Sequence, residues 1–593
     1  MSSFLGVDRS VTGKRWLARP VDERLALAHA QSRDLPELVG RILAARGVGL
    51  EEVDLFLEPK LRSLMPDPAA LRDMESAAER LARAVMKGER VAIFGDYDVD
   101  GATSTALLTR FLRAVGTDPI LYIPDRIQEG YGPNAPALLR LKERGVDLVV
   151  TVDCGVTAFD PLEAAADAGL EVLVVDHHKA EPRLPRAAAV VNPNRLDDPM
   201  GATLGHLAAV GVSFLLAVAA NRVLRKAGWY GGRAEPDLMG WLDLVALGTV
   251  CDVVPLTGLN RAMVCQGLKI MARRTNPGIA ALADVAGVNE RIDAYHVGYI
   301  VGPRVNAGGR VGRSDLGARI LSTEDPLEAA EIARQLHDLN AERRAIEAAV
   351  LDEALEKLAT VKSVSDDLVF VAGEGWHPGV IGIVAARLKE RYGRPACVVA
   401  LDGGIGKASG RSVRGVDLGS AVIAARQDGL LVAGGGHAMA AGFTVAEPKL
   451  AELEAYLAGR ISAQLAEHGP LVPTLHLDGA LGCRGATTQL IGHLSRLGPF
   501  GTGNSEPRFA VSDARVVRAD VVGGAHVRVI LTGADGARLK GIAFRCLEGE
   551  LGRTLLTSGG IPLHLAGTLR ADRWNGNDGV QLLIDDAAPA GGY

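Results

Sequence analysis

The sequence predicts an α/β protein in three parts: a domain on a parallel sheet, a second α/β domain reached through a long helix, and a C-terminal β-barrel. Apolar runs of strand length alternate with helical segments over 91–192, which is typical of a parallel sheet covered by helices. A second strand–helix alternation starts at residue 368. Beyond about residue 471, short alternating runs are separated by Gly and Asp turns, which indicates a small barrel.

Residues 1–80 are polar and mixed, with a helical stretch at 35–57, and are expected to form an N-terminal extension that packs on the first domain. The first domain is expected over 81–325, and its residues 206–290 are predicted to be mostly helical. Its expected strands are 91–94, 120–123, 148–152, 172–175 and 188–192, and the expected helices between them are 102–115, 135–144 and 161–168.

A long charged helix with few breakers is expected over 326–360, where it joins the first domain to the second over 361–470. In the second domain the patterns predict strands at 368–372 and 396–401, and helices at 380–391 and 449–468. Residues 471–593 are predicted to form the barrel, with strands at 527–531 and 539–545, and an oligonucleotide-binding (OB) fold is the expected type.

Size and composition agree with several domains. The chain of 593 residues exceeds the ~250–300 residues at which single cores stop growing. Its hydrophobic content of 48% suffices for proper cores, and its 71 glycines with 4% aromatics are typical of an Ala/Gly/Val-rich α/β protein. A net charge of −6 argues against a protein that coats nucleic acid through bulk electrostatics. A polyanion would therefore be bound by a local basic surface.

Three features predict a cytoplasmic protein without a membrane partner. No apolar run reaches the roughly 18 residues of a membrane span. The N-terminal residues lack the basic region and apolar core of a secretory signal. The six cysteines are scattered without a Cys-x-x-Cys pair, so neither a zinc knuckle nor a disulfide framework is expected.

Acidic side chains follow three of the predicted strands. Residues 95–101 follow the first strand and contain three aspartates, Asp153 follows the strand at 148–152, and the triplet 176–178 (Asp-His-His) follows the strand at 172–175. In an open parallel sheet the carboxyl ends of neighbouring strands share one edge, and ligands bind there. These side chains are therefore expected to meet.

Carboxylates and imidazoles gathered in this way predict a site for divalent metal and phosphate-ester chemistry. Asp96, Asp98 and Asp100 alternate, so they would share a face in an extended segment. Asp252 lies in an almost wholly apolar segment, where an unpaired carboxylate is costly unless a cation binds it. Carboxylates suit magnesium and manganese, and histidine shifts the preference toward manganese. Taken singly, each of these residues has another explanation: the alternating aspartates could form a calcium loop, Asp153 could cap a helix, and Asp252 could be a hydrogen-bonded acid of the core. Their joint placement favours the metal site.

The acidic motifs, in this order, resemble those of the DHH phosphoesterase superfamily. Residues 376–382, 406–412 and 434–442 resemble its DHH-associated domain. Residues 130–132, 302–310 and 497–504 resemble the signatures of its bacterial single-strand-specific exonucleases. The resemblance covers about residue 40 to the end. It departs from the superfamily pattern at Phe94, where many relatives carry a histidine, and Asp96 is expected to compensate in part.

The resemblance implies a DHH catalytic domain that hydrolyses single-stranded DNA from 5′ to 3′, in repair and recombination, with two Mn²⁺ or Mg²⁺ ions. Asp153 would bridge the ions, and His178 would hydrogen-bond the scissile phosphate or hold a ligand in place. The ligands of one ion would be Asp98 with Asp96, and those of the other would be Asp100, His177 and Asp252. A single-strand-binding protein and a helicase are reasonable partners.

Arginine and glycine-rich segments are expected to bind the phosphates, because the guanidinium fork matches phosphate oxygens. The second-domain residues suggest a cup for a terminal 5′ phosphate, as the resemblance implies. Tyr131 could stack on a base or fill the core, and any single arginine could instead form a surface salt bridge. The expected substrate-binding residues are Arg126 and Tyr131; Arg304, Asn306 and Arg310 in one Gly-rich loop; Ser409, Arg411 and Ser412 in a second; and His437.

Three other functions stay open. They are a phosphodiesterase for very short oligonucleotides or cyclic dinucleotides, a polyphosphate or pyrophosphate hydrolase, and a binding protein of the replication machinery that does not cut. The length of the chain, the motifs at 302–310 and the barrel favour an enzyme for long strands. The intact acids argue against the non-enzyme.

Overall fold

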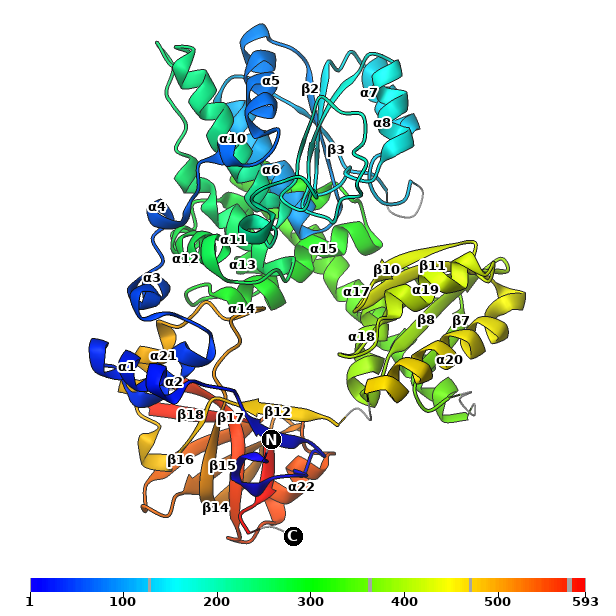
Figure 1. Cartoon of the computed structure of the whole chain (residues 1–593). Helices are drawn as coiled ribbons and strands as arrows, with labels where there is room; N and C mark the ends of the chain where they lie inside the picture. Colours follow the sequence, from blue (N-terminus) through cyan, green and yellow to red (C-terminus); the bar gives the residue numbers. More distant parts are fainter. Residues whose placement is uncertain (1, 126–128, 361–364, 469–471, 573–578, 592–593) are drawn as a thin grey trace. The chain divides into compact units, whose positions relative to one another are not determined.

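The protein is represented by a computed structural model that describes residues 2–125, 129–360, 365–468, 472–572 and 579–591 (Figure 1). The chain divides into two compact units, one made of residues 1–66, 253–266 and 472–593, and the other of residues 67–252 and 267–471. The predicted fold class is confirmed, with two α/β sheets and a closed barrel. Within the described residues, no helix has both the length and the apolar character that a membrane crossing needs.

The first sheet is wholly parallel, with the strand order β3-β2-β4-β5-β6. The chain adds β3 on one side of β2 and then β4 on the other side, so the winding reverses between β2 and β4. Ligands of such sheets bind outside the carboxyl ends of the strands at this point. The strands are β2 (Val91–Gly95), β3 (Ile120–Tyr122), β4 (Leu148–Val152), β5 (Glu171–Val175) and β6 (Ala189–Val191).

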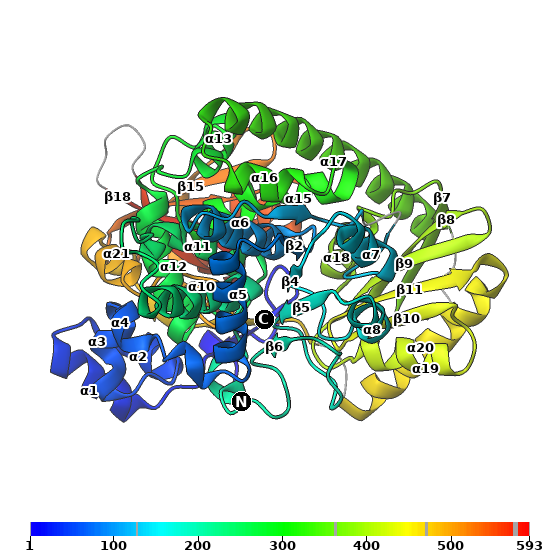
Figure 2. The ribbon, with the colours of Figure 1, turned by 90° about the horizontal axis from the view of Figure 1, so that it is seen from above.

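Helices cover both faces of this sheet, as Figures 1 and 2 show. One face carries α5 (Met74–Lys87), α6 (Val99–Ala114) and α10 (Ala209–Lys226). The other face carries α7 (Ala135–Glu143) and α8 (Phe159–Asp167), which bury a cluster of leucine, valine and alanine side chains. Phe94 belongs to this second core and stacks on Tyr122, with ring centroids 5.0 Å apart.

The chain from α9 onward is mostly helical, as predicted for 206–290, and the long helix expected over 326–360 is present as α17. The helices are α9 (Gly201–Leu204), α11 (Leu242–Cys251), α12 (Gly258–Met271), α13 (Pro277–Val285), α14 (Ala294–His296), the π-helix η5 (Val297–Val301), α15 (Gly302–Val311), α16 (Leu316–Ser322) and α17 (Pro326–Thr360).

The second sheet has the order β10-β11-β9-β8-β7, in which only β7 and β8 pair in parallel. Its predicted strands and helices are present, and it also contains β9, β10, β11 and α19, which were not predicted; β9 lies where a Gly-rich loop was expected. Glycine permits close packing there, because a Cβ on Gly410 would lie 2.6 Å from Leu418. The elements are β7 (Val369–Glu374), α18 (Ile381–Tyr392), β8 (Ala396–Asp402), β9 (Ile405–Arg411), α19 (Leu418–Gln427), β10 (Ala433–His437), β11 (Ala440–Ala446) and α20 (Leu450–His468).

In the other unit, five strands in the order β14-β15-β16-β18-β17 close into a barrel through the pairing of β14 with β17. The strands are β14 (Phe509–Val522), β15 (His526–Thr532), β16 (Arg538–Ala543), β17 (Pro562–Asp572) and β18 (Gly579–Pro589). The unit also contains α1 (Glu23–Arg33), α2 (Glu37–Ala45), α3 (Val53–Leu57), α4 (Leu61–Leu64), β13 (Gly479–Leu481), α21 (Thr488–Ser495) and α22 (Glu550–Thr557).

The N-terminal segment folds with the barrel, whereas the sequence predicted that residues 1–80 pack on the first domain. β1 (Arg15–Ala18) pairs in parallel with β12 (Thr474–Leu477), and residues 1–66 belong to the barrel unit. Strand pairing between segments so far apart in the chain leaves no signal in local periodicity. The other predicted domain boundaries stay a proposal.

Replacing Trp16 by phenylalanine is expected to destabilise the barrel unit. The Trp16 side chain is fully buried, and its Nε1 donates a hydrogen bond to the buried Asp586 carboxylate at 2.9 Å. Phenylalanine keeps most of the apolar volume but removes the donor, which costs about 1–3 kcal/mol. The measurement is the thermal unfolding midpoint of the full chain. Trp229→Phe is the control, because that indole donates to the neutral Val115 carbonyl at 3.2 Å; equal shifts would contradict this account.

Candidate metal centre

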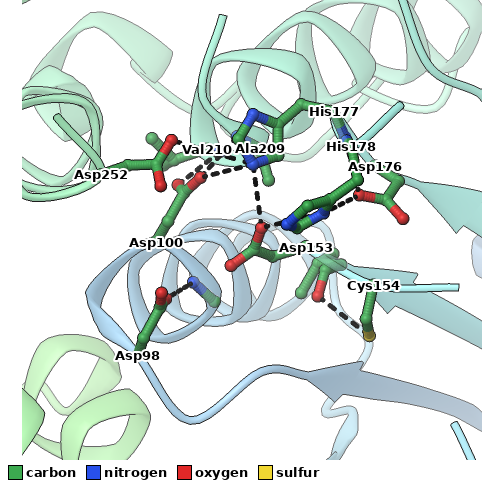
Figure 3. A network of polar contacts seen from close by, with 12 residues as sticks. Asp98, Asp100, Asp153, Cys154, Asp176, His177, His178, Ala209, Val210 and Asp252 are labelled. Carbon is green, nitrogen blue, oxygen red and sulfur yellow. Dashed lines mark hydrogen bonds and ion pairs between the residues drawn. The ribbon is translucent and has the colours of Figure 1, made fainter. Parts of the chain in front are cut away.

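Side chains from three strand ends and from α11 meet beyond the carboxyl edge of the first sheet (Figure 3). Three groups of them could hold an ion, and within each group the ligand atoms lie within 4.8 Å of one another. The groups are Asp96, Asp98 and Asp153; Asp100, His177 and Asp252; and Asp153, His177 and His178. The structure thus brings together the six predicted metal ligands and His178, from four separate elements.

The three aspartates after β2 do not share one extended face, which corrects the expectation drawn from their alternation. Helix α6 begins at Val99, three residues earlier than predicted, and Asp98 is its N-cap, accepting a hydrogen bond from the Gly101 amide at 3.0 Å. Asp100 therefore lies in the first helical turn and belongs to a different ligand group from Asp98. Gly101 is required here, because a Cβ would lie 2.5 Å from the Asp96 carbonyl oxygen.

The Asp100 carboxylate is held by the start of α10. Its two oxygens accept hydrogen bonds from the backbone amides of Ala209 (2.6 Å) and Val210 (2.9 Å). These are among the amides that a helix N-terminus leaves without an internal partner, and the helix dipole there favours a negative charge. The carboxylate is thus fixed in position although it is almost completely buried.

His177 presents one ring nitrogen to the carboxylates. Its Nδ1 lies 3.0 Å from the Leu207 carbonyl, which can only accept, so Nδ1 carries the proton and the neutral ring offers its Nε2 lone pair. Nε2 lies 3.3 Å from Asp153, 3.8 Å from Asp252 and 3.9 Å from Asp100. A nitrogen and three carboxylates around one point are a suitable ligand set for Mn²⁺.

The crowded carboxylates repel one another in the absence of a cation. Burial and the neighbouring acids raise the pKa of Asp100 and of Asp153 well above the usual range. Burial and the Asp98 carboxylate raise the pKa of Asp252 to about 7. In addition, Asp252 Oδ2 is buried and accepts no hydrogen bond from the residues that the structure describes. A divalent cation would relieve both the repulsion and this unmet acceptor, so the residues fit the ions that were predicted.

His178 is oriented by the buried Asp176. Asp176 Oδ1 accepts a hydrogen bond from His178 Nδ1 at 2.8 Å. The carboxylate also accepts hydrogen bonds from the backbone amides of Val156, His177 and His178. Burial opposes the charge of this carboxylate, but the hydrogen bonds outweigh it and hold the pKa of Asp176 at about 2. Burial likewise opposes the charge of His178, but the contact with Asp176 raises its pKa to about 9.

Tyr131 lies at the rim of the centre. Its hydroxyl donates to the Asp153 carbonyl at 3.0 Å, and its ring stands edge-on to His178 with centroids 6.1 Å apart. The residue is 53% exposed, so it is not a core aromatic, and one of the two predicted alternatives is removed. Arg126, which was expected beside it, lies outside the described residues.

A separate cavity of about 390 Å³ contains part of the predicted phosphate-binding set. Ser409 and Arg411 alternate along β9, and Arg411 Nη1 donates to Ser409 Oγ at 3.0 Å. Lys407 lies on the same face of the strand, because side chains two residues apart point to the same side. The sequence analysis did not identify Lys407 as a phosphate-binding residue, although this alternation could have done so. The polar lining residues are Arg310, Lys407, Ser409, Arg411 and Thr444.

Residues 302–310 form helix α15, not the predicted Gly-rich loop, and Ser409 and Arg411 lie on a strand rather than a loop. The glycines of α15 serve close packing, because a Cβ on Gly309 would lie 2.7 Å from the Tyr97 carbonyl oxygen. Asn306 and Arg310 are four residues apart and share one face of the helix. Arg310 lines the cavity and donates to the Gly379 carbonyl at 3.0 Å.

Four predicted phosphate-binding residues do not line the cavity: Arg304, Asn306, Ser412 and His437. Ser412 is buried and donates to the Val416 carbonyl at 2.8 Å. His437 is exposed at the end of β10, beyond Ala433 and Gly434, which line the cavity. Arg304 turns back along its own helix and donates to the Ile300 carbonyl at 2.6 Å. In each case the side chain's direction depends on backbone geometry that the residue type does not reveal.

The fold and the centre define a phosphoesterase of the DHH class. Residues 90–249 match the DHH family N-terminal domain, residues 365–463 the DHHA1 domain, and residues 477–586 the RecJ OB domain. The chain belongs to the RecJ family of single-stranded-DNA-specific exonucleases, which confirms the resemblance seen in its motifs.

Relatives match nearly the whole chain. It is 34% identical to RecJ of Bacillus subtilis over 97% of this chain and 71% of that protein. It is 35% identical to RecJ of Escherichia coli over 96% of this chain and 98% of that protein. The crystal structure of Thermus thermophilus RecJ in complex with Mn²⁺ has a TM-score of 0.78 at 30% identity, covering 96% of this chain and 78% of that one. The Mg²⁺ complex has a TM-score of 0.72 at 29% identity, covering 96% of this chain and 77% of that one.

Proposed function

We propose that this protein is a metal-dependent exonuclease that hydrolyses single-stranded DNA, 5′ to 3′, with two Mn²⁺ or Mg²⁺ ions. The observation that carries the proposal is the convergence of His177 Nε2 with the carboxylates of Asp100, Asp153 and Asp252 at the edge of the sheet. The relatives' names and the metals bound in the Thermus thermophilus structures support the same activity.

Each ion would have its own ligands. Asp96 and Asp98 would hold one ion, and Asp100, His177 and Asp252 the other. Asp153 would bridge them, because it shares a group with Asp96 and Asp98 and lies 3.3 Å from His177 Nε2. Phe94 contributes no ligand, since its ring is packed in the core beside Tyr122. When bound, a pair of divalent ions activates a water molecule and stabilises the phosphoryl oxygens during in-line displacement.

His178 is proposed to hold the scissile phosphate. Asp176 accepts a hydrogen bond from Nδ1, which leaves Nε2 for an oxygen of the phosphate. Tyr131 is proposed to stack on a nearby base, since half of its surface is exposed beside His178. Both side chains lie next to Asp153, so substrate and ions would be held by adjoining groups.

The cavity of the second domain is proposed to bind the terminal 5′ phosphate. Arg310, Arg411 and Lys407 supply positive charge, and Ser409 supplies a hydroxyl donor. An arginine fork binds phosphate oxygens in a fixed geometry, so this cavity would distinguish a phosphorylated end from an internal position. The polarity of cutting follows from recognition of that end.

The setting of the enzyme is part of the proposal. Repair and recombination are the expected processes, with a single-strand-binding protein and a helicase as partners. We propose the cytoplasm as the compartment, because the described residues contain no disulfide and buried thiols suit a reducing environment.

The test is cleavage of strands labelled at either end. Cleavage should stop when a chelator is added and resume when Mn²⁺ is restored. On a single strand, a label at the 5′ end should be released before the 3′ end is shortened. A duplex, a dinucleotide and inorganic polyphosphate are parallel substrates that test the alternative functions. A protein that binds single strands but does not cleave them with any added metal would contradict the proposal.

A further inference from the structure

Two tyrosines are exposed side by side just before α15. Tyr295 lies on α14 and is 56% exposed; Tyr299 lies on the π-helix η5 and is 74% exposed. Their ring centroids are 5.1 Å apart and their planes are inclined by 30°. We call them the tyrosine pair. Single π-helical turns in proteins are frequent at functional sites, and large aromatic rings held in water are typical of recognition surfaces.

The π-helix is anchored to the element that carries a proposed metal ligand. Cys251 Sγ donates to the Val297 carbonyl at 3.6 Å, and a Cβ on Gly302 would lie 2.4 Å from the same sulfur. Cys251 directly precedes Asp252 at the end of α11. The turn that presents the tyrosine pair is therefore packed against the end of the helix that leads into the metal centre.

The charges beside the pair favour a polyanion. Arg304 donates to the carbonyl of Ile300, the residue after Tyr299, and its Nε donates to His337 Nδ1 on α17 at 3.4 Å, so its guanidinium lies between the π-helix and α17. The two acids of the segment just before the pair, Glu290 and Asp293, are both engaged by the His296 ring, at 3.1 Å and 2.7 Å. An arginine on the helix that follows exposed aromatic rings supplies, together with those rings, the two kinds of group that bind the backbone and bases of a single strand.

The pair also has a defined position relative to the phosphate cavity. Tyr299 precedes Arg310, which lines the cavity, by eleven residues of continuous helix. At the rise of an α-helix this separation is about 16 Å. With the 5′ end in the cavity and the metal centre packed along the same helix, a base at the tyrosine pair would lie on the 3′ side of the bond that is cut.

We propose that the tyrosine pair is a stacking platform for a nucleobase of single-stranded DNA, on the 3′ side of the cleaved bond. This inference rests on the proposed function and adds a binding position to it. The platform would tolerate any base, because every base has a π-face, and it would hold the part of the strand that is not yet degraded.

The test is the affinity of the full chain for an uncleavable phosphorothioate single strand, measured by fluorescence anisotropy. Tyr299→Ala is expected to raise Kd by roughly tenfold, the equivalent of losing one stacked base. Tyr299→Phe should bind like the wild type, since the ring is retained. A 2-aminopurine placed at successive positions should change its emission at one register only, and Tyr299→Ala should abolish that change.

Tyr392→Ala is the matched control, because Tyr392 is 37% exposed, lies at the end of α18 and also neighbours an arginine. It should leave Kd unchanged. If Tyr299→Ala binds DNA like the wild type, the platform is excluded and the pair is left as a surface for a protein partner. Wild-type cleavage assayed alongside separates this failure from failure of the proposed function, which would appear as a chain that never cuts.

Discussion

Replacing Asp153 by asparagine is expected to lower the rate of DNA cleavage by roughly a thousandfold or more, because loss of the bridging carboxylate removes several kcal/mol of transition-state stabilisation. The exchange is nearly isosteric. Asp153 has a left-handed backbone with φ of 61°, which asparagine adopts at least as readily as aspartate. The fold should therefore survive, and DNA binding should change little. The measurement is single-turnover cleavage at saturating Mn²⁺.

The same variant should be more stable than the wild type in the absence of metal. Burial and the acids around it disfavour the charged form of Asp153, so a neutral amide relieves repulsion and should raise the thermal midpoint of the metal-free protein. Mn²⁺ should then add much less stability than it adds to the wild type, since a ligand stabilises only in proportion to its binding. Higher stability together with lost activity is the result expected when a functional site lowers the stability of the fold.

Asp243→Asn is the control for these measurements. Asp243 is a buried aspartate on α11 whose pKa burial raises to about 6, and it belongs to none of the three ligand groups. Its replacement should leave cleavage and the Mn²⁺-dependent shift of the midpoint as in the wild type. An active Asp153→Asn enzyme, or an equal loss in both variants, would exclude the bridging role.

Replacing Arg411 by alanine is expected to weaken recognition of the 5′ end. A charge-assisted hydrogen bond to phosphate contributes about 1.5–3 kcal/mol, so KM for a 5′-phosphorylated strand should rise by roughly tenfold or more. A strand with a 5′ hydroxyl lacks that partner and should be affected much less. The preference for the phosphorylated end should therefore shrink, while Mn²⁺ affinity stays unchanged. The measurement is KM on matched strands that differ only in the 5′ group.

Arg414→Ala provides the comparison, because Arg414 is an exposed arginine three residues further on that does not line the cavity. It removes the same charge from the same part of the domain. A general electrostatic effect would appear in both variants and on both strands. Equal losses for the two 5′ groups would show that Arg411 does not bind the terminal phosphate.

Much of the architecture was predictable because it depends on local patterns. Buried strands such as 148–152 and 172–175 appear in the sequence as short apolar runs, and α17 appears as a long segment without breakers. Glycine-rich segments were misjudged for the opposite reason. In β9, β10 and α15 the glycines permit close packing, but their low propensity for strand and helix made the segments look like loops.

The candidate site was predictable in composition but not in arrangement. Acids at the ends of neighbouring parallel strands must approach one edge, and that rule placed Asp153 and the 176–178 triplet together from sequence alone. Whether Asp98 and Asp100 serve one ion or two depends on where α6 begins. That is set by the hydrogen bond from Gly101 to Asp98 and by the α10 amides that hold Asp100.

By itself, the sequence determined the order of the domains, the set of acids and imidazoles, and the resemblance to a family of nucleases, since each is encoded in residue type and short-range spacing. Only the tertiary structure decided which side chains share a group, which arginines face the cavity, that residues 1–66 fold with the barrel, and that two tyrosines remain exposed before α15. The physical reason is that these features depend on packing between segments far apart in the chain, and periodicity reports only whether a residue is buried, not what it is buried against.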